Sequence, residues 1–163
     1  MSDAALGAAA PVFRAVCPDD AATLLTLARA FHSEDGHPLD PAAEAAIARV
    51  CAGEPLAPCW LIELAGETVG YVVLGLGFSL EHGGSDGFVD DLYLVPQARG
   101  RGVGRAALAF AEVEARTRGV QTLHLEVEPA NARAYRLYQD WGFNDLGRRL
   151  MSKRLAPVSG PEP

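Results

Sequence analysis

The sequence has no apolar run approaching the roughly 18 consecutive residues that a membrane-spanning helix needs. Residues 1–11 are rich in alanine, but they lack the basic start and apolar block of a secretory signal peptide. A chain of 163 residues suits one domain. We therefore expect a disordered leader over residues 1–11, a single domain over residues 12–155, a loose tail over residues 156–163, and a cytoplasmic location.

Cysteine and positive charge are both scarce. The three cysteines, Cys17, Cys51 and Cys59, form no C-x-x-C pair, which is typical of reduced thiols in a cytoplasmic protein. The 14 Lys and Arg residues are outnumbered by 21 Asp and Glu residues, giving a net charge of −7. This balance disfavours nucleic acid and anionic membranes as partners and favours a cationic substrate.

One stretch organises the chain, residues 89–105, which read V-D-D-L-Y-L-V-P-Q-A-R-G-R-G-V-G-R. It begins as an apolar strand that Pro96 ends, because proline cannot continue a β-ladder. Helical spacing of apolar residues starts at Val103. Three glycines, Gly100, Gly102 and Gly104, therefore lie between a strand and the start of a helix.

Such a junction favours an anion. Free backbone N–H groups and the helix dipole attract negative charge there, and arginines such as Arg99 and Arg101 bind phosphate oxygens. We therefore predict a ligand with a pyrophosphate. A P-loop is excluded because no Lys-Ser or Lys-Thr occurs. The pattern Gly102-x-Gly104-x-x-Ala107 fits a dinucleotide fold, but its first glycine does not follow the strand directly, and that interpretation is weaker.

Periodicity and turn residues indicate the other elements. Asp19 or Asp20 is placed to cap the first helix, Asn131 to cap the last, and Gly119 and Gly142 to end helices. Gly75 and Gly77 indicate a bulge or a close backbone approach. The expected elements are a strand at 12–16, helices at 20–31 and 41–50, a hairpin of 59–64 with 68–80, a strand at 122–128, a helix from 131, and a strand or strand pair within 143–155. This order predicts a mixed α/β fold.

Two motifs carry a resemblance to a known family. Arg99-x-x-Gly102-x-Gly104 resembles the Q/R-x-x-G-x-G/A pyrophosphate loop of the GCN5-related N-acetyltransferases, the GNAT superfamily. Asn131-x-x-Ala134-x-x-x-Tyr138-x-x-x-Gly142-Phe143 resembles the second motif of that family. The resemblance implies the fold class α/β (mixed α+β): a single domain with a central, mixed but mostly antiparallel twisted sheet flanked by helices.

The resemblance also implies roles for residues. The loop would hold the pyrophosphate of acetyl-CoA, the strand end would bind pantetheine through its backbone, and Asn131 would contact the pantetheine arm. Relatives often carry Asn where this chain has Glu128, which weakens the pantetheine assignment near that position. The predicted acetyl-CoA-binding residues are Leu92, Tyr93, Leu94, Arg99, Gly100, Arg101, Gly102, Val103, Gly104, Arg105, Asn131 and Tyr138.

The implied reaction moves an acetyl group from acetyl-CoA to a primary amine by direct attack through a tetrahedral intermediate. An alkyl amine with a pKa of ~10.4 is neutral in about one molecule in 10³ at pH 7, which costs about 4 kcal/mol unless a base removes the proton. Asp90, Asp91 and Glu126 are the candidate bases. Asp90 and Asp91 should face opposite sides of their strand. Asp90 is favoured because relatives that acetylate polyamines carry an acid there. Tyr138 would protonate the thiolate; from spacing alone it could equally be a core aromatic.

The predicted acceptor is a small amine or polyamine-like molecule. A protein N-terminus or lysine as acceptor is one alternative, and a non-catalytic acyl-CoA-binding module is another. No metal site is expected, because His32, Glu34, Asp35 and His37 crowd one short loop with no ligand from elsewhere. That loop is instead expected to be solvated and to form a wall of the substrate pocket. The sequence leaves the formation of a homodimer open.

Overall fold

The computed structural model describes residues 9–155, so residues 1–8 of the predicted leader and the whole predicted tail lie outside the described residues. Two short 3-10 turns, η1 (Pro18–Asp20) and η2 (Pro96–Ala98), precede α2 and follow β4. The other elements are β1 (Val12–Ala15), α2 (Ala21–Glu34), α3 (Pro41–Cys51), β2 (Cys59–Leu64), β3 (Glu67–Ser79), β4 (Gly84–Leu94), α4 (Val103–Thr117), β5 (Thr122–Leu125) and α5 (Ala132–Trp141).

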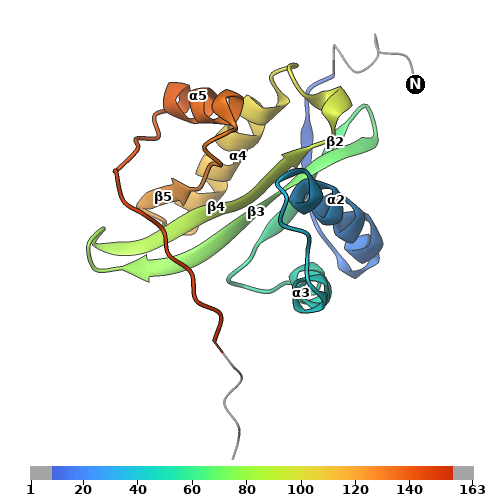
Figure 1. The fold of residues 1–163 in the computed structure, drawn as a ribbon. Helices are drawn as coiled ribbons and strands as arrows, with labels where there is room; N and C mark the ends of the chain where they lie inside the picture. The colour runs from blue at the N-terminus through green and yellow to red at the C-terminus, as the bar shows by residue number, and fades with distance from the viewer. Residues whose placement is uncertain (1–8, 156–163) are drawn as a thin grey trace, which may run out of the picture.

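The five described strands form one twisted sheet in the order β1-β2-β3-β4-β5 (Figure 1). The pairs β1–β2, β2–β3 and β3–β4 are antiparallel, and β4–β5 is parallel. The parallel pair requires a crossover connection, which α4 supplies. The predicted mixed, mostly antiparallel sheet with flanking helices is therefore confirmed, including the hairpin of β2 and β3.

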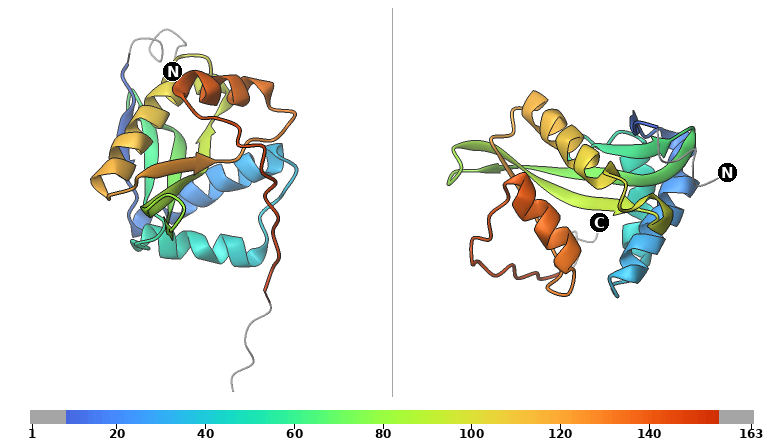
Figure 2. Two further views of the ribbon diagram at one scale, coloured as in Figure 1. Left: turned by 90° about the vertical axis from the view of Figure 1, so that its left-hand side faces the viewer. Right: turned by 90° about the horizontal axis from the view of Figure 1, so that it is seen from above.

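Helices cover both faces of the sheet, as the view from above in Figure 2 shows. Helices α2 and α3 pack on one side, which we call the α2 face, where Leu24 and Leu27 contact Tyr71 and Val73 in one buried cluster. Helix α4 packs on the other side, the α4 face. Complete burial of a leucine or valine side chain contributes roughly 1.5–3 kcal/mol, so these clusters hold the layers together.

Local signals fix several helix ends, and those of α5 lie at the residues predicted from the sequence. Asp40 accepts a hydrogen bond from the Ala43 N–H at 2.8 Å and starts α3. The Asn131 side chain accepts one from Ala134 at 3.1 Å and starts α5. Gly142 ends α5 with a φ of +103°, a conformation that glycine adopts easily. Asp20 precedes α2, but its carboxylate does not cap that helix and instead accepts hydrogen bonds from Arg14.

The predicted last strand within residues 143–155 is wrong, because no part of this segment joins the sheet. Asp145 accepts a hydrogen bond from the Gly147 N–H at 2.7 Å, and this local turn competes with strand pairing. The segment instead crosses in front of the α2 face (Figure 1) and is held by two ion pairs, Arg148–Glu81 and Arg154–Asp40. The strand expected at 122–128 also ends earlier, at Leu125.

Candidate active site

The glycine loop before α4 has a backbone suited to anions. Gly100 and Gly102 have φ values of +77° and +81°, in the left-handed region that favours glycine. Gly102 is the N-cap residue of α4, and no side chain among residues 9–155 caps the N–H groups of the first turn. Uncapped N–H groups and the positive end of the helix dipole together form an anion-binding site.

Helix α5 packs against this loop. A Cβ atom on Gly104 would lie 3.5 Å from a side-chain carbon of Leu137 and 3.8 Å from one of Leu94, so the start of α4 lies in contact distance of α5 and β4. A guanidinium nitrogen of Arg133 lies 3.4 Å from the position of a Cβ on Gly100. Arg133 therefore adds positive charge beside the loop, a contribution that no motif in the sequence indicated.

The other predicted loop residues are placed differently. Val103 is buried in the core cluster of the α4 face. The guanidinium of Arg105 lies over the Trp141 ring, 5.9 Å from its centre, and Arg101 is half-buried in the loop.

Arg99 points back along the sheet rather than toward the start of α4. Its Nε donates to the Leu94 carbonyl at 2.7 Å, and its terminal nitrogen pairs with a Glu34 carboxylate oxygen at 2.7 Å. The guanidinium also lies 5.4 Å from the centre of the Tyr93 ring, whose hydroxyl donates to Glu34 at 3.0 Å. Arg99 thus links β4 to the end of α2. Its contact with phosphate stays a prediction.

Only the first half of β4 has a strand on each side. Its pairing with β5 runs from Asp86 to Val89, whereas its pairing with β3 continues to Leu94. Within the described part of the chain, residues 90–94 therefore have no neighbouring strand on the β5 side. This open edge can hydrogen-bond to an extended ligand, and it contains Leu92, Tyr93 and Leu94, the predicted pantetheine contacts.

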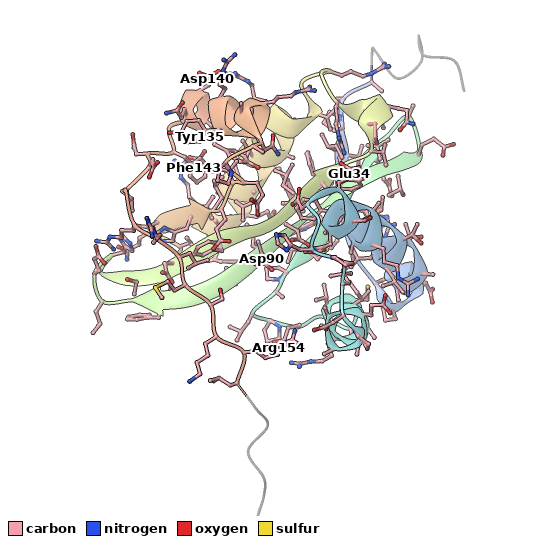
Figure 3. The ribbon with its side chains drawn as sticks, viewed as in Figure 1. Glu34, Asp90, Tyr135, Asp140, Phe143 and Arg154 are labelled. Atoms are coloured by element: carbon pink, nitrogen blue, oxygen red, sulfur yellow. The ribbon has the colours of Figure 1, made fainter. Side chains whose placement is uncertain are left out.

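A β-bulge lies at Asp90. Val73 of β3 pairs with Asp91, and the next residue, Leu74, pairs with Val89, so Asp90 is an extra residue in β4. The bulge interrupts the alternation that would turn Asp90 and Asp91 to opposite faces. Figure 3 shows Asp90 on the α2 face, between α2 and the C-terminal segment. The expected irregularity near Gly75 is real, but the extra residue is on the partner strand.

The three predicted bases meet at this bulge. Asp91 accepts a hydrogen bond from the Tyr71 hydroxyl at 2.7 Å and lies 3.5 Å from His32 Nε2. Asp90 accepts no hydrogen bond from any residue between 9 and 155. Solvent reaches its carboxyl group, yet the surrounding protein raises its pKa, as do the negative charges of Asp91 and Glu126, while His32 opposes the shift. Asp90 therefore has a raised pKa and, unlike Asp91, no hydrogen-bond donor among residues 9–155.

Tyr138 lies half-buried on α5, and its ring forms a T-shaped pair with the Phe143 ring, with 6.1 Å between the ring centres. Burial raises the pKa of the Tyr138 hydroxyl, and the charge of Asp35 adds to the effect. The hydroxyl has no hydrogen-bond partner within residues 9–155, so it makes no hydrogen bond there that would stabilise the fold. The Asn131 side-chain oxygen is used by the helix cap. Its amide N–H groups point to no described partner.

The polar segment after α2 faces α5 and the end of β5. The pKa of Asp35 is raised by burial and by the charges of Glu128 and Glu34. His37 Nε2 lies 3.6 Å from a Glu128 carboxylate oxygen. The predicted loop starts later than expected, because His32 and Glu34 continue α2. Its role as a wall of the substrate pocket stays a prediction.

A pocket of about 300 Å³ opens on the α2 face beside Asp90. Sequence reasoning singled out Gly75, Gly77 and Asp90 but did not bring them together in a pocket, because the pocket is formed by residues that face each other across β3 and β4. The lining residues are Leu56, Gly75, Leu76, Gly77, Asp86, Gly87, Phe88 and Asp90.

Two classes of feature are missing from the described chain. Between residues 9 and 155, no three His, Cys, Asp or Glu side chains lie close enough together to hold a metal ion. The helices of the same range include none with the length and hydrophobicity needed to cross a membrane.

Comparison with known proteins gives a consistent result. Residues 22–143 match the acetyltransferase (GNAT) family. An aminoglycoside N(6')-acetyltransferase type 1 from Stenotrophomonas maltophilia is 29% identical over 150 residues, which cover 86% of this chain and 91% of that protein. A mycothiol acetyltransferase from Thermobispora bispora is 35% identical over 98 residues, 58% of this chain. That match spans only 32% of the length of the mycothiol enzyme.

A solved structure is similar over nearly the whole chain. It is the integron cassette protein HFX_CASS3 from the mobile metagenome of Cole Harbour Salt Marsh, with 38% identity and a TM-score of 0.73. The alignment covers 89% of this chain and 91% of the cassette protein.

Proposed function

Because this chain belongs to the acetyltransferase (GNAT) family, as its two motifs predicted, we propose that it transfers the acetyl group of acetyl-CoA to a small or polyamine-like primary amine. One observation carries the proposal: the anion-binding loop, the open edge of β4 and the carboxylates at the bulge lie along the same strand and the turn that follows it. The first two features suit coenzyme A, and the third suits an amine.

The coenzyme would lie along β4 and the start of α4. Its pyrophosphate fits the uncapped N–H groups after Gly102, with Arg133 adding positive charge. The amide groups of its pantetheine arm fit the open edge at Leu92–Leu94, where they would take the place of a neighbouring strand. The Leu94 carbonyl is already bonded to Arg99, so other backbone groups of this edge would make the contact.

The bulge carboxylates would prepare the acceptor. An ammonium ion bound at Asp90 loses its proton to that carboxylate, directly or through water, and the raised pKa of Asp90 makes it a stronger base than an ordinary Asp. The neutral nitrogen then attacks the thioester carbonyl carbon, forming the C–N bond. The tetrahedral intermediate then collapses. As the C–S bond breaks, Tyr138 donates its proton to the leaving sulfur, and the acetylated nitrogen loses its second proton to the tyrosinate, directly or through water. The products are an N-acetyl amine and coenzyme A, with the first proton held by Asp90 until it passes to solvent.

The charge around the site supports an amine acceptor. Asp90, Asp91 and Glu126 meet at the bulge, and Glu128 and Asp35 face each other nearby. The relative from Stenotrophomonas maltophilia, which matches over most of its length, is named for the acetylation of an aminoglycoside. Both observations favour a small cationic acceptor.

A matched pair of variants tests the coenzyme site. Gly102 and Gly119 flank the two ends of α4, both have left-handed φ values (+81° and +77°), and neither has a heavy atom within 4 Å of a Cβ position. Gly102→Glu and Gly119→Glu therefore introduce the same strain and the same charge. We expect Gly102→Glu to weaken acetyl-CoA binding by at least ~10-fold in calorimetry, about 1.4 kcal/mol, while Gly119→Glu binds normally. Equal affinities in the two folded variants would overturn the proposal.

A further inference from the structure

We propose that the pocket beside Asp90 binds a second cationic group of the acceptor, so that the preferred acceptor is a diamine or polyamine with an apolar chain between its charges. This inference rests on the proposed function, because it takes Asp90 as the place of the reacting amine. The pocket lies next to the bulge, where Gly75 and Gly77 of β3 pair with Phe88 and Asp86 of β4, and neither of the two family motifs includes these four residues.

The pocket exists because two side chains are missing from one row of β3. Tyr71 and Val73 point to the α2 face, where α2 and α3 cover them. Side chains alternate along a strand, so Gly75 and Gly77 continue the same row. Because glycine has no side chain, only the backbone of β3 is present at these two positions of the row. A Cβ on Gly75 would meet only the Phe88 Cβ, at 3.7 Å. The floor of the pocket is therefore backbone.

The residues opposite these glycines form the wall of the pocket. Phe88 pairs with Gly75, and Asp86 pairs with Gly77, so both side chains project to the same face. Leu56 borders the pocket from the loop before β2. A hydrophobic wall of Phe88 and Leu56 suits a methylene chain better than a hydroxylated ring, which would leave its hydroxyl groups without partners.

The Oδ1 atom of Asp86 lies above the glycine backbone that forms the bottom of the pocket. Its Oδ2 lies 3.7 Å from His124 Nε2, while its Oδ1 lies 2.8 Å from the position of a Cβ on Gly77. No donor within residues 9–155 bonds to this Oδ1. The missing side chain at Gly77 thus leaves room both for the carboxylate and for a cation that approaches it.

The spacing of the two carboxylates sets the length of the acceptor. Asp86 and Asp90 are four residues apart on β4, which corresponds to roughly 13 Å of strand, shortened by the bulge. A single ammonium ion can occupy only one end of this distance. A molecule with two ammonium groups on an apolar chain can reach both carboxylates while its chain crosses Phe88.

Steady-state kinetics with matched amines test the subsite. The substrates are straight-chain diamines of increasing length, each paired with the monoamine of the same carbon chain. We expect kcat/KM to favour the longer diamines over their monoamines by about tenfold, roughly 1.4 kcal/mol. Asp86→Asn should bring this ratio close to one. Glu67→Gln makes the same charge change at the exposed first residue of β3 and should preserve the ratio.

A second variant tests the floor. Gly75→Val fills the space above β3 and should shift the preference from long diamines to short ones. A preference for diamines that survives Asp86→Asn, or no preference in the wild-type enzyme, would refute the subsite while leaving acetyl transfer to amines intact. A folded wild-type protein that binds acetyl-CoA but acetylates no amine would instead refute the proposed function.

Discussion

Replacing Tyr138 by phenylalanine separates a catalytic role from a packing role. The substitution keeps the ring against Phe143 and removes only the hydroxyl. Removing a buried hydroxyl usually costs about 1–3 kcal/mol when it leaves a partner unsatisfied. The Tyr138 hydroxyl has no such partner within residues 9–155, so we expect the melting temperature and the affinity for acetyl-CoA to stay unchanged.

The expected loss lies in turnover. General acid catalysis contributes ~10²–10⁴-fold, and a thiolate whose thiol has a pKa near ~8.5 is already a fair leaving group, so the lower end of that range applies. We expect kcat to fall by about 10²-fold, roughly 2.7 kcal/mol. Because burial raises the pKa of Tyr138, the proton needed by an acid is retained throughout the neutral range.

The assay follows thiol release with a trapping dye, together with thermal unfolding and calorimetry. Tyr135→Phe is the matched control on the same helix, since its hydroxyl accepts a hydrogen bond from Gln139 at 3.2 Å and has no assigned role in the reaction. Figure 3 labels Tyr135 on α5 and Phe143 after it. An unchanged kcat in a folded Tyr138→Phe protein would refute the acid role. A marked loss of stability would refute the packing argument.

Two further predictions concern ionisation. Because the pKa of Asp90 is raised in the folded protein, ionisation of Asp90 opposes folding once the pH exceeds the ordinary carboxyl pKa of about 3.9. Asp90→Asn should therefore raise the melting temperature at neutral pH, leave it unchanged below about pH 3.9, and lower kcat/KM. Thermal unfolding across pH tests this, and a lower melting temperature of the variant at neutral pH would contradict it. Cys17 is exposed, whereas burial raises the pKa of Cys51 and raises that of Cys59 to about 12. Iodoacetamide at mildly alkaline pH should therefore modify only Cys17 in the native protein and all three after unfolding; mass spectrometry that finds native Cys59 alkylated would show this burial to be wrong.

Local signals made much of the fold predictable from sequence. Asn131 and Gly142 mark the ends of α5 because capping depends on residues only a few positions apart. The glycine loop before α4 is equally local. The wrong prediction of a strand within residues 143–155 shows the limit of such reasoning. β-forming residues occur there, but a hydrogen-bonded turn between Asp145 and Gly147 forms instead of strand pairing.

Features that depend on distant pairings could not be predicted. The bulge at Asp90 is a property of the register between β3 and β4. The orientation of Arg99 depends on Glu34, 65 residues earlier, and nothing near either residue indicates the pair. The pocket likewise appears only when Gly75 is known to face Phe88. The residue types of the candidate site were thus predictable, whereas their partners were not.

The C-terminal segment has a consequence for how such an enzyme can diversify. Residues 143–155 cross the α2 face, where we propose that the acceptor binds, without forming a strand. Their two ion pairs join exposed arginines, Arg148 and Arg154, to Glu81 and Asp40. Exposed ion pairs contribute about 0.2–1 kcal/mol each, a small part of what the buried clusters contribute. Mutations in residues 143–155 can therefore change the surface at the proposed acceptor site with little loss of stability. The acetyl-transfer reaction can then be kept during evolution while the preferred acceptor changes.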